Sequence, residues 1–314
     1  MSVISENTKP YNLVVILGPT ASGKTSLAVD LAFDIGGEII SADSRQVYRG
    51  MDLGTGKDYR EFTRKDRTIP YHLIDIVDAD YEFNLFEYQQ HFYRVFKEVR
   101  ERRAIPILVG GTGLYLESII EGYDMAWVPP DPHLHEELEG YDMDVLRQRL
   151  YALNPSPHNT TDLVDKRRLI RAIEIEERRV SALPDSTVDK SAVIPLVTGI
   201  RVERPLLQRR IELRLRNRLD MGMVEEVKRL HLNGLSWKKL DYFGLEYRYV
   251  GRYLQGELTY DEMVTVLAIR IRQFAKRQET WFRRMERKGI CIHWIDYDDY
   301  ESLKSMVEEC MVGA

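Results

Sequence analysis

The chain has 314 residues, of which 44% are hydrophobic, and a formal net charge of −5. This composition can build one large or two ordinary domains with a proper core, and the negative charge does not by itself favour a nucleic-acid partner. No stretch approaches the roughly 18 apolar residues that a membrane span needs, and the polar first ten residues do not look like a signal peptide. With only two cysteines, Cys291 and Cys310, the sequence predicts a cytoplasmic protein without a disulfide framework or zinc cluster.

The charges are unevenly distributed along the chain. Basic residues gather at 166–171, 201–218 and 270–288, whereas acidic residues gather at 131–144 and 296–301. Such segregation can give an acidic protein a basic face for RNA. The alternative interpretation is that each cluster is simply the solvated face of a helix.

The first part of the chain alternates between strand and helix patterns. Apolar runs predict strands at 13–17, 38–41, 73–77 and 105–109, with helices at 25–35 and 86–103. Strands that alternate with helices of this length are typical of a parallel sheet covered by helices on both faces. The expected fold class is therefore α/β.

The pattern changes from about residue 123. A breaker cluster at 129–132 is followed by charged, helical sequence without strand signals. We expect residues 123–193 to form a helical insertion between the two parts of the core, 1–122 and 194–314. After the insertion, the sequence predicts a strand from 194, helices at 205–221, 224–232 and 260–287, and a closing strand at 290–295.

A phosphate-binding motif lies between the first strand and the first helix. The sequence Gly18-Pro-Thr-Ala-Ser-Gly-Lys24-Thr25 matches the P-loop pattern G-x-x-x-x-G-K-[ST]. Its backbone N–H groups surround phosphate oxygens at a helix N-terminus, Lys24 adds a positive charge, and Thr25 is a ligand for Mg²⁺. The core is therefore expected to be P-loop NTPase-like, with phosphate bound by Gly18, Pro19, Thr20, Ala21, Ser22, Gly23, Lys24 and Thr25.

The residues that follow the P-loop help to indicate which phosphate compound binds there. An ordinary P-loop ATPase has a carboxylate at the end of an apolar strand that organises Mg²⁺. Here the strand at 105–109 is followed by glycines, and Asp75 is a possible substitute for that carboxylate. Asp43 follows the strand at 38–41, at the sheet edge where ligands bind, so it is the candidate general base. It could instead be an N-cap or a magnesium-shell carboxylate. Thr112 could offer a hydroxyl to the same nucleophile.

Several motifs resemble the tRNA dimethylallyltransferase (IPP transferase) family in its bacterial form. They occur in the family's order over nearly the whole chain: the P-loop, Ile39-Ile-Ser-Ala-Asp-Ser-Arg-Gln-Val-Tyr48, Gly50-Met-Asp-Leu-Gly-Thr55, His72-Leu-Ile-Asp75, Val109-Gly-Gly-Thr-Gly-Leu-Tyr115, Arg168-Leu-Ile-Arg-Ala-Ile-Glu174 and Lys276-Arg-Gln-Glu-Thr-Trp-Phe282. The resemblance implies transfer of a dimethylallyl group from its diphosphate to N6 of the adenosine 3′ of the tRNA anticodon, with Mg²⁺.

The resemblance also implies roles for individual residues. The P-loop, with Lys24, would hold the donor's diphosphate, and Arg210 and Arg214 would close over it. Asp43 would accept the N6 proton, and Thr112 would fix the amine. Segments similar to those that touch tRNA are Asp43, Ser44, Arg45 and Gln46, and Arg167, Arg168, Leu169, Ile170 and Arg171. The aromatic candidates for base stacking, which could equally be core residues, are Tyr242, Phe243, Tyr247, Trp281 and Phe282.

Some positions depart from the family pattern, and other functions remain open. Glu246 stands where a basic residue is usual, and His135 where an arginine is common, which points to an altered choice of tRNA. One alternative is a small-molecule P-loop kinase, in which Asp43 would activate a hydroxyl and Arg210 and Arg214 would be lid arginines. That enzyme would consume ATP. A second alternative is a tRNA-binding protein without catalysis.

Overall fold

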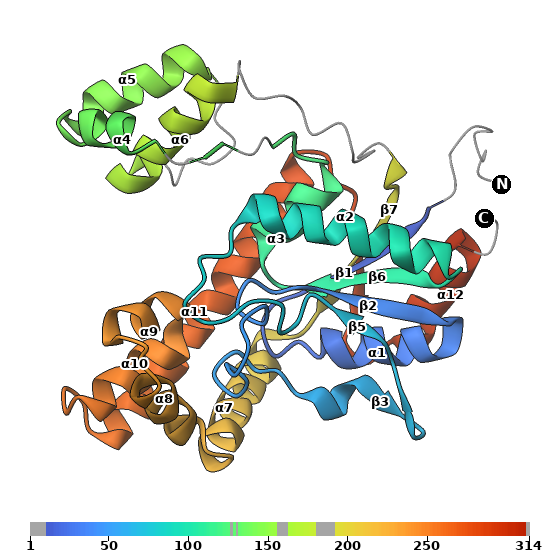
Figure 1. The fold of residues 1–314 in the computed structure, drawn as a ribbon. Helices are drawn as coiled ribbons and strands as arrows, with labels where there is room; N and C mark the ends of the chain where they lie inside the picture. The colour runs from blue at the N-terminus through green and yellow to red at the C-terminus, as the bar shows by residue number, and fades with distance from the viewer. Residues whose placement is uncertain (1–10, 126–127, 130, 156–162, 180–191, 312–314) are drawn as a thin grey trace. The chain divides into compact units, whose positions relative to one another are not determined.

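The computed structural model describes residues 11–125, 128–129, 131–155, 163–179 and 192–311 (Figure 1). The chain divides into two compact units. One unit consists of residues 1–122 and 190–314, and the other of residues 123–189. No helix within the described ranges is long and apolar enough to cross a membrane.

Six of the described strands of the larger unit form one sheet in the order β5-β2-β6-β1-β7-β8, in which every neighbouring pair is parallel. This confirms the predicted α/β fold with a parallel sheet core. The strands are β1 (Leu13–Leu17), β2 (Gly37–Ala42), β5 (Tyr71–His72), β6 (Ile105–Gly110), β7 (Pro195–Arg201) and β8 (His293–Asp296). All five residues of β1 are buried, as expected for a strand covered on both faces.

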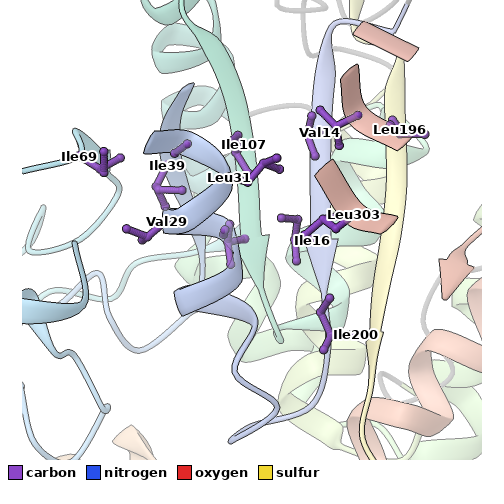
Figure 2. Close-up of a cluster of buried hydrophobic side chains, with 14 of the residues drawn as sticks. Val14, Ile16, Val29, Leu31, Ile39, Ile69, Ile107, Leu196, Ile200 and Leu303 are labelled. Carbon is purple, nitrogen blue, oxygen red and sulfur yellow. The ribbon is translucent and has the colours of Figure 1, made fainter. Parts of the chain in front are cut away.

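Helices cover both faces of this sheet. On one face, α1 (Lys24–Ile35) and α12 (Tyr300–Met311) pack their apolar side chains against alternate residues of the strands. Figure 2 shows part of this cluster, with Ile16 of β1, Ile107 of β6 and Leu303 of α12. On the other face lie α2 (Leu85–Glu101) and α3 (Gly113–Ile120), and a capping box between Asn84 and Glu87 begins α2.

The rest of this unit is helical, apart from a short hairpin. A 3₁₀ turn at Tyr59–Phe62 leads into the antiparallel pair β3 (Thr63–Arg64) and β4 (Arg67–Thr68). The remaining helices are α7 (Arg204–Asp220), α8 (Met223–Leu232), α9 (Trp237–Phe243), α10 (Leu245–Leu254) and α11 (Tyr260–Arg287). A capping box between Thr259 and Glu262 begins the long α11.

The strand predicted at 73–77 is wrong. The sheet pairing of β5 ends at His72, because Leu73 and Asp75 have φ angles of 61° and 55°, in the left-handed region that no strand can contain. The Asp75 carboxylate accepts hydrogen bonds from the buried Lys57 ammonium, at 2.5 Å, and from the Tyr59 hydroxyl. These polar contacts, which the apolar pattern of the segment does not reveal, favour a loop over a strand.

The smaller unit is described by three helices: α4 (Pro132–Glu139), α5 (Met143–Leu153) and α6 (Lys166–Arg179). Asp131 begins α4 by accepting hydrogen bonds from the backbone N–H groups of His133 and Leu134. The apolar side chains of the three helices form a separate small core, which contains Leu138, Leu146, Leu150, Leu169, Ile170 and Ile173.

Truncation of a buried residue in β1 tests the sheet core. Ile16 is fully buried between β6, β7 and the helices on its face, so Ile16→Ala removes methyl groups and leaves a cavity. We expect the free energy of unfolding in urea to fall by about 2–5 kcal/mol. Leu213 on α7 is 61% exposed, and the control Leu213→Ala should change it by less than about 0.5 kcal/mol. Equal effects of the two substitutions would contradict this core assignment.

Candidate active site

Three turns with predicted site residues begin at the same level of the sheet. Gly110, the last residue of β6, pairs with Leu17 of β1 on one side and with Ala42 of β2 on the other. The P-loop therefore starts beside the residues that follow β6 and β2. We call residues 43–46 the Asp43 turn and residues 111–112 the Thr112 turn. This edge is formed by the carboxyl ends of parallel strands, where ligands bind in open α/β sheets.

The P-loop has the backbone of an anion cradle. Ala21 and Gly23 have φ angles of 63° and 89°, so the chain turns sharply before α1 begins at Lys24. Gly23 is the N-cap of this helix and brings no side chain to cover the first N–H groups. These N–H groups and the positive end of the helix dipole suit a phosphate.

Two arginines of α7 contact the P-loop. Arg210 donates a hydrogen bond to the Ser22 carbonyl oxygen at 3.1 Å, and its guanidinium carbon lies 4.1 Å from the centre of the Tyr297 ring. Arg214 donates to the Gly56 carbonyl oxygen at 3.0 Å and approaches Thr20 Oγ1 at 3.5 Å. The two arginines are one helical turn apart and share a face of α7. The structure thus places both of them at the predicted phosphate site.

The positive charges at the P-loop repel one another. Burial lowers the pKa of Lys24 to about 8, and the charge of Arg214 adds to this effect while that of Asp43 opposes it. The charge of Arg218, followed by burial, lowers the pKa of Arg214 to about 10. An anion bound in the loop would relieve this repulsion, so the electrostatics favour a multiply charged phosphate ligand.

Asp43 and Thr112 lie on adjacent, hydrogen-bonded turns. Thr112 donates its backbone N–H to the Ala42 carbonyl oxygen at 3.2 Å, and its hydroxyl oxygen accepts the Ser44 N–H at 3.1 Å. Asp43 Oδ1 accepts from the backbone N–H of Arg45 at 2.8 Å and of Gln46 at 3.4 Å. Within the described part of the chain, Asp43 Oδ2 has no hydrogen-bond partner. One carboxylate oxygen therefore caps the turn, and the other is available to a ligand.

Arg45 of the Asp43 turn is partly exposed and lies beside an exposed aromatic ring of α9. The Arg45 guanidinium carbon lies 5.0 Å from the centre of the Tyr242 ring, and Tyr242 is 50% exposed. Arginine planes and exposed tyrosines are surfaces on which RNA bases stack. Gln46 is turned inward, where its side chain accepts a hydrogen bond from the Ser41 hydroxyl at 3.2 Å.

The other aromatic stacking candidates are less accessible. Phe243, Tyr247 and Phe282 are no more than 1% exposed and belong to the core. Trp281 is partly exposed and lies under the Arg284 guanidinium, at 4.2 Å from the ring centre. Helical spacing alone does not separate an exposed aromatic residue such as Tyr242 from its buried neighbours.

In the smaller unit, the predicted tRNA segment lies on α6. Arg167 and Arg168 are exposed, whereas Leu169 and Ile170 are at most 1% exposed in the core of this unit. Arg171 donates to the buried Glu174 carboxylate at 2.8 Å and to the Val128 carbonyl oxygen at 2.5 Å. The exposed cationic surface of this segment therefore comes from its arginines and not from Leu169 or Ile170.

His135, the departure from the family pattern on α4, also binds Glu174. Its Nδ1 lies 2.7 Å from a Glu174 carboxylate oxygen. Glu174 is only 2% exposed and is shared between His135 and Arg171. This histidine therefore contacts an acidic side chain within the smaller unit.

A loop at residues 52–57 supports Arg214 and was given no role from sequence. The buried Glu226 carboxylate accepts hydrogen bonds from the backbone N–H groups of Asp52, Leu53 and Gly54 at 2.7–3.1 Å. The glycines in Gly54-Thr55-Gly56 indicate a special loop, but nothing in the sequence connects them with Glu226, more than 170 residues away.

Glu246 and Asp75 also have partners that sequence analysis did not anticipate. Glu246 forms an ion pair with Arg218 at 3.2 Å, and burial raises the pKa of this glutamate although Arg218 opposes the effect. It therefore balances the charge next to Arg214. Asp75 forms an ion pair with the buried Lys57 ammonium at 2.5 Å.

The lowered pKa of Lys24 predicts how phosphate binding depends on pH. In the ligand-free protein, Lys24 is charged below pH 8 and loses its proton as the pH rises through that value. Because a bound anion favours the charged form, affinity for inorganic diphosphate should fall above pH 8, by at most about 10-fold per pH unit. Isothermal titration calorimetry between pH 7 and 10 measures this. The control is Lys24→Arg, whose side chain stays charged over this range, so that its pH profile shows only the titration of diphosphate itself. Identical pH profiles for wild type and Lys24→Arg would contradict the prediction.

Comparison with known proteins relates this geometry to one family. A family model described as IPP transferase matches residues 46–285. A protein named tRNA dimethylallyltransferase 1 from Syntrophus aciditrophicus is 57% identical, covering 95% of this chain and 97% of the relative. One of the same name from Geotalea daltonii is 51% identical, covering 91% of each. A solved tRNA isopentenylpyrophosphate transferase from Bacillus halodurans has a TM-score of 0.68 at 32% identity, covering 97% and 96%. The chain belongs to the IPP transferase family.

Proposed function

We propose that the chain transfers a dimethylallyl group from dimethylallyl diphosphate to N6 of the adenosine 3′-adjacent to the anticodon of tRNA, releasing diphosphate. Its family and the names of its relatives support tRNA prenylation. The structural observation that carries the proposal is that Gly110 pairs with both Leu17 and Ala42. The P-loop and the turns that carry the Asp43 carboxylate and the Thr112 hydroxyl therefore begin at one edge of the sheet. Such an arrangement suits one anionic donor and one nucleophile.

The donor's diphosphate would lie in the P-loop at residues 18–25. Backbone N–H groups at the start of α1 and the charge of Lys24 would bind its oxygens. Arg210 and Arg214 would close over it from α7, since both already touch the loop. As the bond between the allylic carbon and the bridging oxygen breaks, its electron pair goes to the diphosphate, and these fixed charges stabilise the leaving group.

The adenine N6 would form the new carbon–nitrogen bond with the allylic carbon. Asp43 Oδ2 would take the proton that N6 loses, because Oδ1 is occupied by the turn. A lone pair of the Thr112 hydroxyl oxygen would accept the second N6–H and hold the amine in line. In this assignment, Asp43 Oδ1 stabilises the turn and Asp43 Oδ2 acts as the general base.

Mg²⁺ fits this site only as a partner of the donor. Across the described ranges, no cluster of three or more His, Cys, Asp or Glu side chains could hold a metal. Thr25, at the start of α1, is the proposed protein ligand, and diphosphate oxygens and waters would supply the other ligands, as is usual for Mg²⁺. When bound, the ion would neutralise part of the diphosphate charge.

The adenine must leave the anticodon loop to reach Asp43, at an unstacking cost of roughly a few kcal/mol. The exposed Tyr242, with the partly exposed Arg45 of the Asp43 turn against its ring, would offer a stacking surface for loop nucleotides. In the smaller unit, Arg167, Arg168 and Arg171 would contact phosphates of the tRNA, which orient the substrate without reading its bases. The proposed substrate places the reaction in the cytoplasm.

A transfer assay with Asp43→Asn tests the proposal. Asparagine retains an oxygen for the Arg45 N–H and so preserves the turn, but it cannot take a proton. The protein is incubated with Mg²⁺, dimethylallyl diphosphate and bulk tRNA, and the nucleosides are weighed by mass spectrometry. Wild type should produce a prenylated adenosine, whereas the variant should be slower by about 10²–10⁴-fold and bind tRNA normally.

Two outcomes would count against parts of this account. A wild-type protein that ignores the prenyl donor but consumes ATP with a small alcohol would be a P-loop kinase. Undiminished transfer by Asp43→Asn, with tRNA prenylation intact, would remove Asp43 as the base and leave the reaction class standing.

A further inference from the structure

We infer that Gln278 is a positioning residue that fixes the donor loop relative to the acceptor amine, an inference that rests on the proposed transfer reaction. Gln278 lies on α11 and is 7% exposed. It has no place in the chemical steps described above. Its side-chain amide nevertheless contacts both of the turns between which those steps would occur.

The two hydrogen bonds of this amide run in opposite directions. Gln278 Oε1 accepts the backbone N–H of Thr20, in the P-loop, at 2.8 Å. Gln278 Nε2 donates to the carbonyl oxygen of Gly111, the residue before Thr112, at 2.9 Å. A side-chain amide carries an oxygen that accepts and an NH₂ group that donates hydrogen bonds. It can therefore bridge a backbone N–H and a backbone C=O. Leucine or methionine would fill the space but leave both backbone groups unpaired.

The bridge is tightly packed. A Cβ atom built on Gly111 would lie 2.3 Å from Gln278 Nε2 and 3.2 Å from the Gly18 carbonyl oxygen. A residue with a side chain at position 111 would therefore push the amide away or separate the two turns. The close fit at Gly111 leaves little freedom in the distance between the P-loop and the Thr112 turn.

This distance matters for the proposed reaction. The donor would sit on the P-loop, and the amine would be held by Thr112, so the Gln278 amide spans the supports of the two reactants. Transfer requires the allylic carbon and N6 to approach within about 3–3.5 Å, and a displacement of about 1 Å can cost about 100-fold in rate. Loss of the bridge should therefore slow the chemical step more than it weakens the binding of either substrate.

The first test is Gln278→Met, which keeps the length of the side chain and removes both hydrogen bonds. We expect kcat per folded enzyme to fall by about 10–100-fold, with the KM of each substrate nearly unchanged. Gln273→Met is the matched control, since Gln273 is exposed on the same helix. Thermal unfolding and inorganic diphosphate binding give the folded fraction of each protein.

The second test, Gln278→Glu, separates positioning from mere stability. An ionised glutamate still accepts the Thr20 N–H but cannot donate to the Gly111 carbonyl oxygen, whereas the protonated acid can do both. The ratio of variant to wild-type kcat should therefore rise as the pH is lowered from 9 to 5. Taking the ratio cancels any pH dependence of the reaction that both proteins share.

Two results would overturn the inference. One is a Gln278→Met enzyme whose kcat per folded molecule equals that of wild type. The other is a Gln278→Glu ratio that stays flat with pH. Either would show that the amide only helps the chain to fold. Both outcomes require an active wild-type prenyltransferase, so they are distinct from failure of the proposed function, in which wild type itself would not transfer the prenyl group.

Discussion

The pairing of Gly110 with both neighbouring strands is the constraint on which the site depends. A Cβ atom built on Gly110 would lie 2.2 Å from the Ala42 carbonyl oxygen, so any larger residue would force β2 and β6 apart. Because Leu17 and Ala42 both align with Gly110, the P-loop, the Asp43 turn and the Thr112 turn all leave the sheet together. Parallel strands make this arrangement possible, since their carboxyl ends meet at one edge. The backbone register alone therefore brings together the three turns to which we assign the reactants.

The site concentrates positive charges that repel one another. Burial, followed by the charge of Arg214, lowers the pKa of Lys24, and the charge of Arg218, followed by burial, lowers the pKa of Arg214. The fold supports them with acids and a rigid loop: Glu246 pairs with Arg218, and Glu226 holds the loop whose Gly56 carbonyl oxygen binds Arg214. Charges fixed before the ligand arrives need no reorganisation when diphosphate leaves, which is how a preorganised site stabilises a departing anion.

Local patterns predicted the parts of the molecule that depend on local physics. A single continuous segment of sequence contains the whole signal for the P-loop, for each buried strand or for each capped helix. The order of these segments predicted the α/β fold. The strand at 73–77 failed because Lys57 and Tyr59 bind Asp75 from outside the segment. The roles of Glu226 and Gln278 could not be predicted, because their partners are more than 160 residues away. Helices α9, α10 and α12 were not predicted, although α10 is as long as the predicted α8 and α12 as long as the predicted α1.

The central claim is that diphosphate in the P-loop faces an amine held between Asp43 and Thr112. The most direct measurement is a crystal structure with an anticodon stem-loop and a donor analogue in which sulfur replaces the bridging oxygen. We predict diphosphate oxygens on the backbone N–H groups at the start of α1, the allylic carbon about 3–3.5 Å from N6, and Asp43 Oδ2 within about 2.6–3.2 Å of N6. Diphosphate bound away from this loop, or an adenine on a different edge of the sheet, would contradict it.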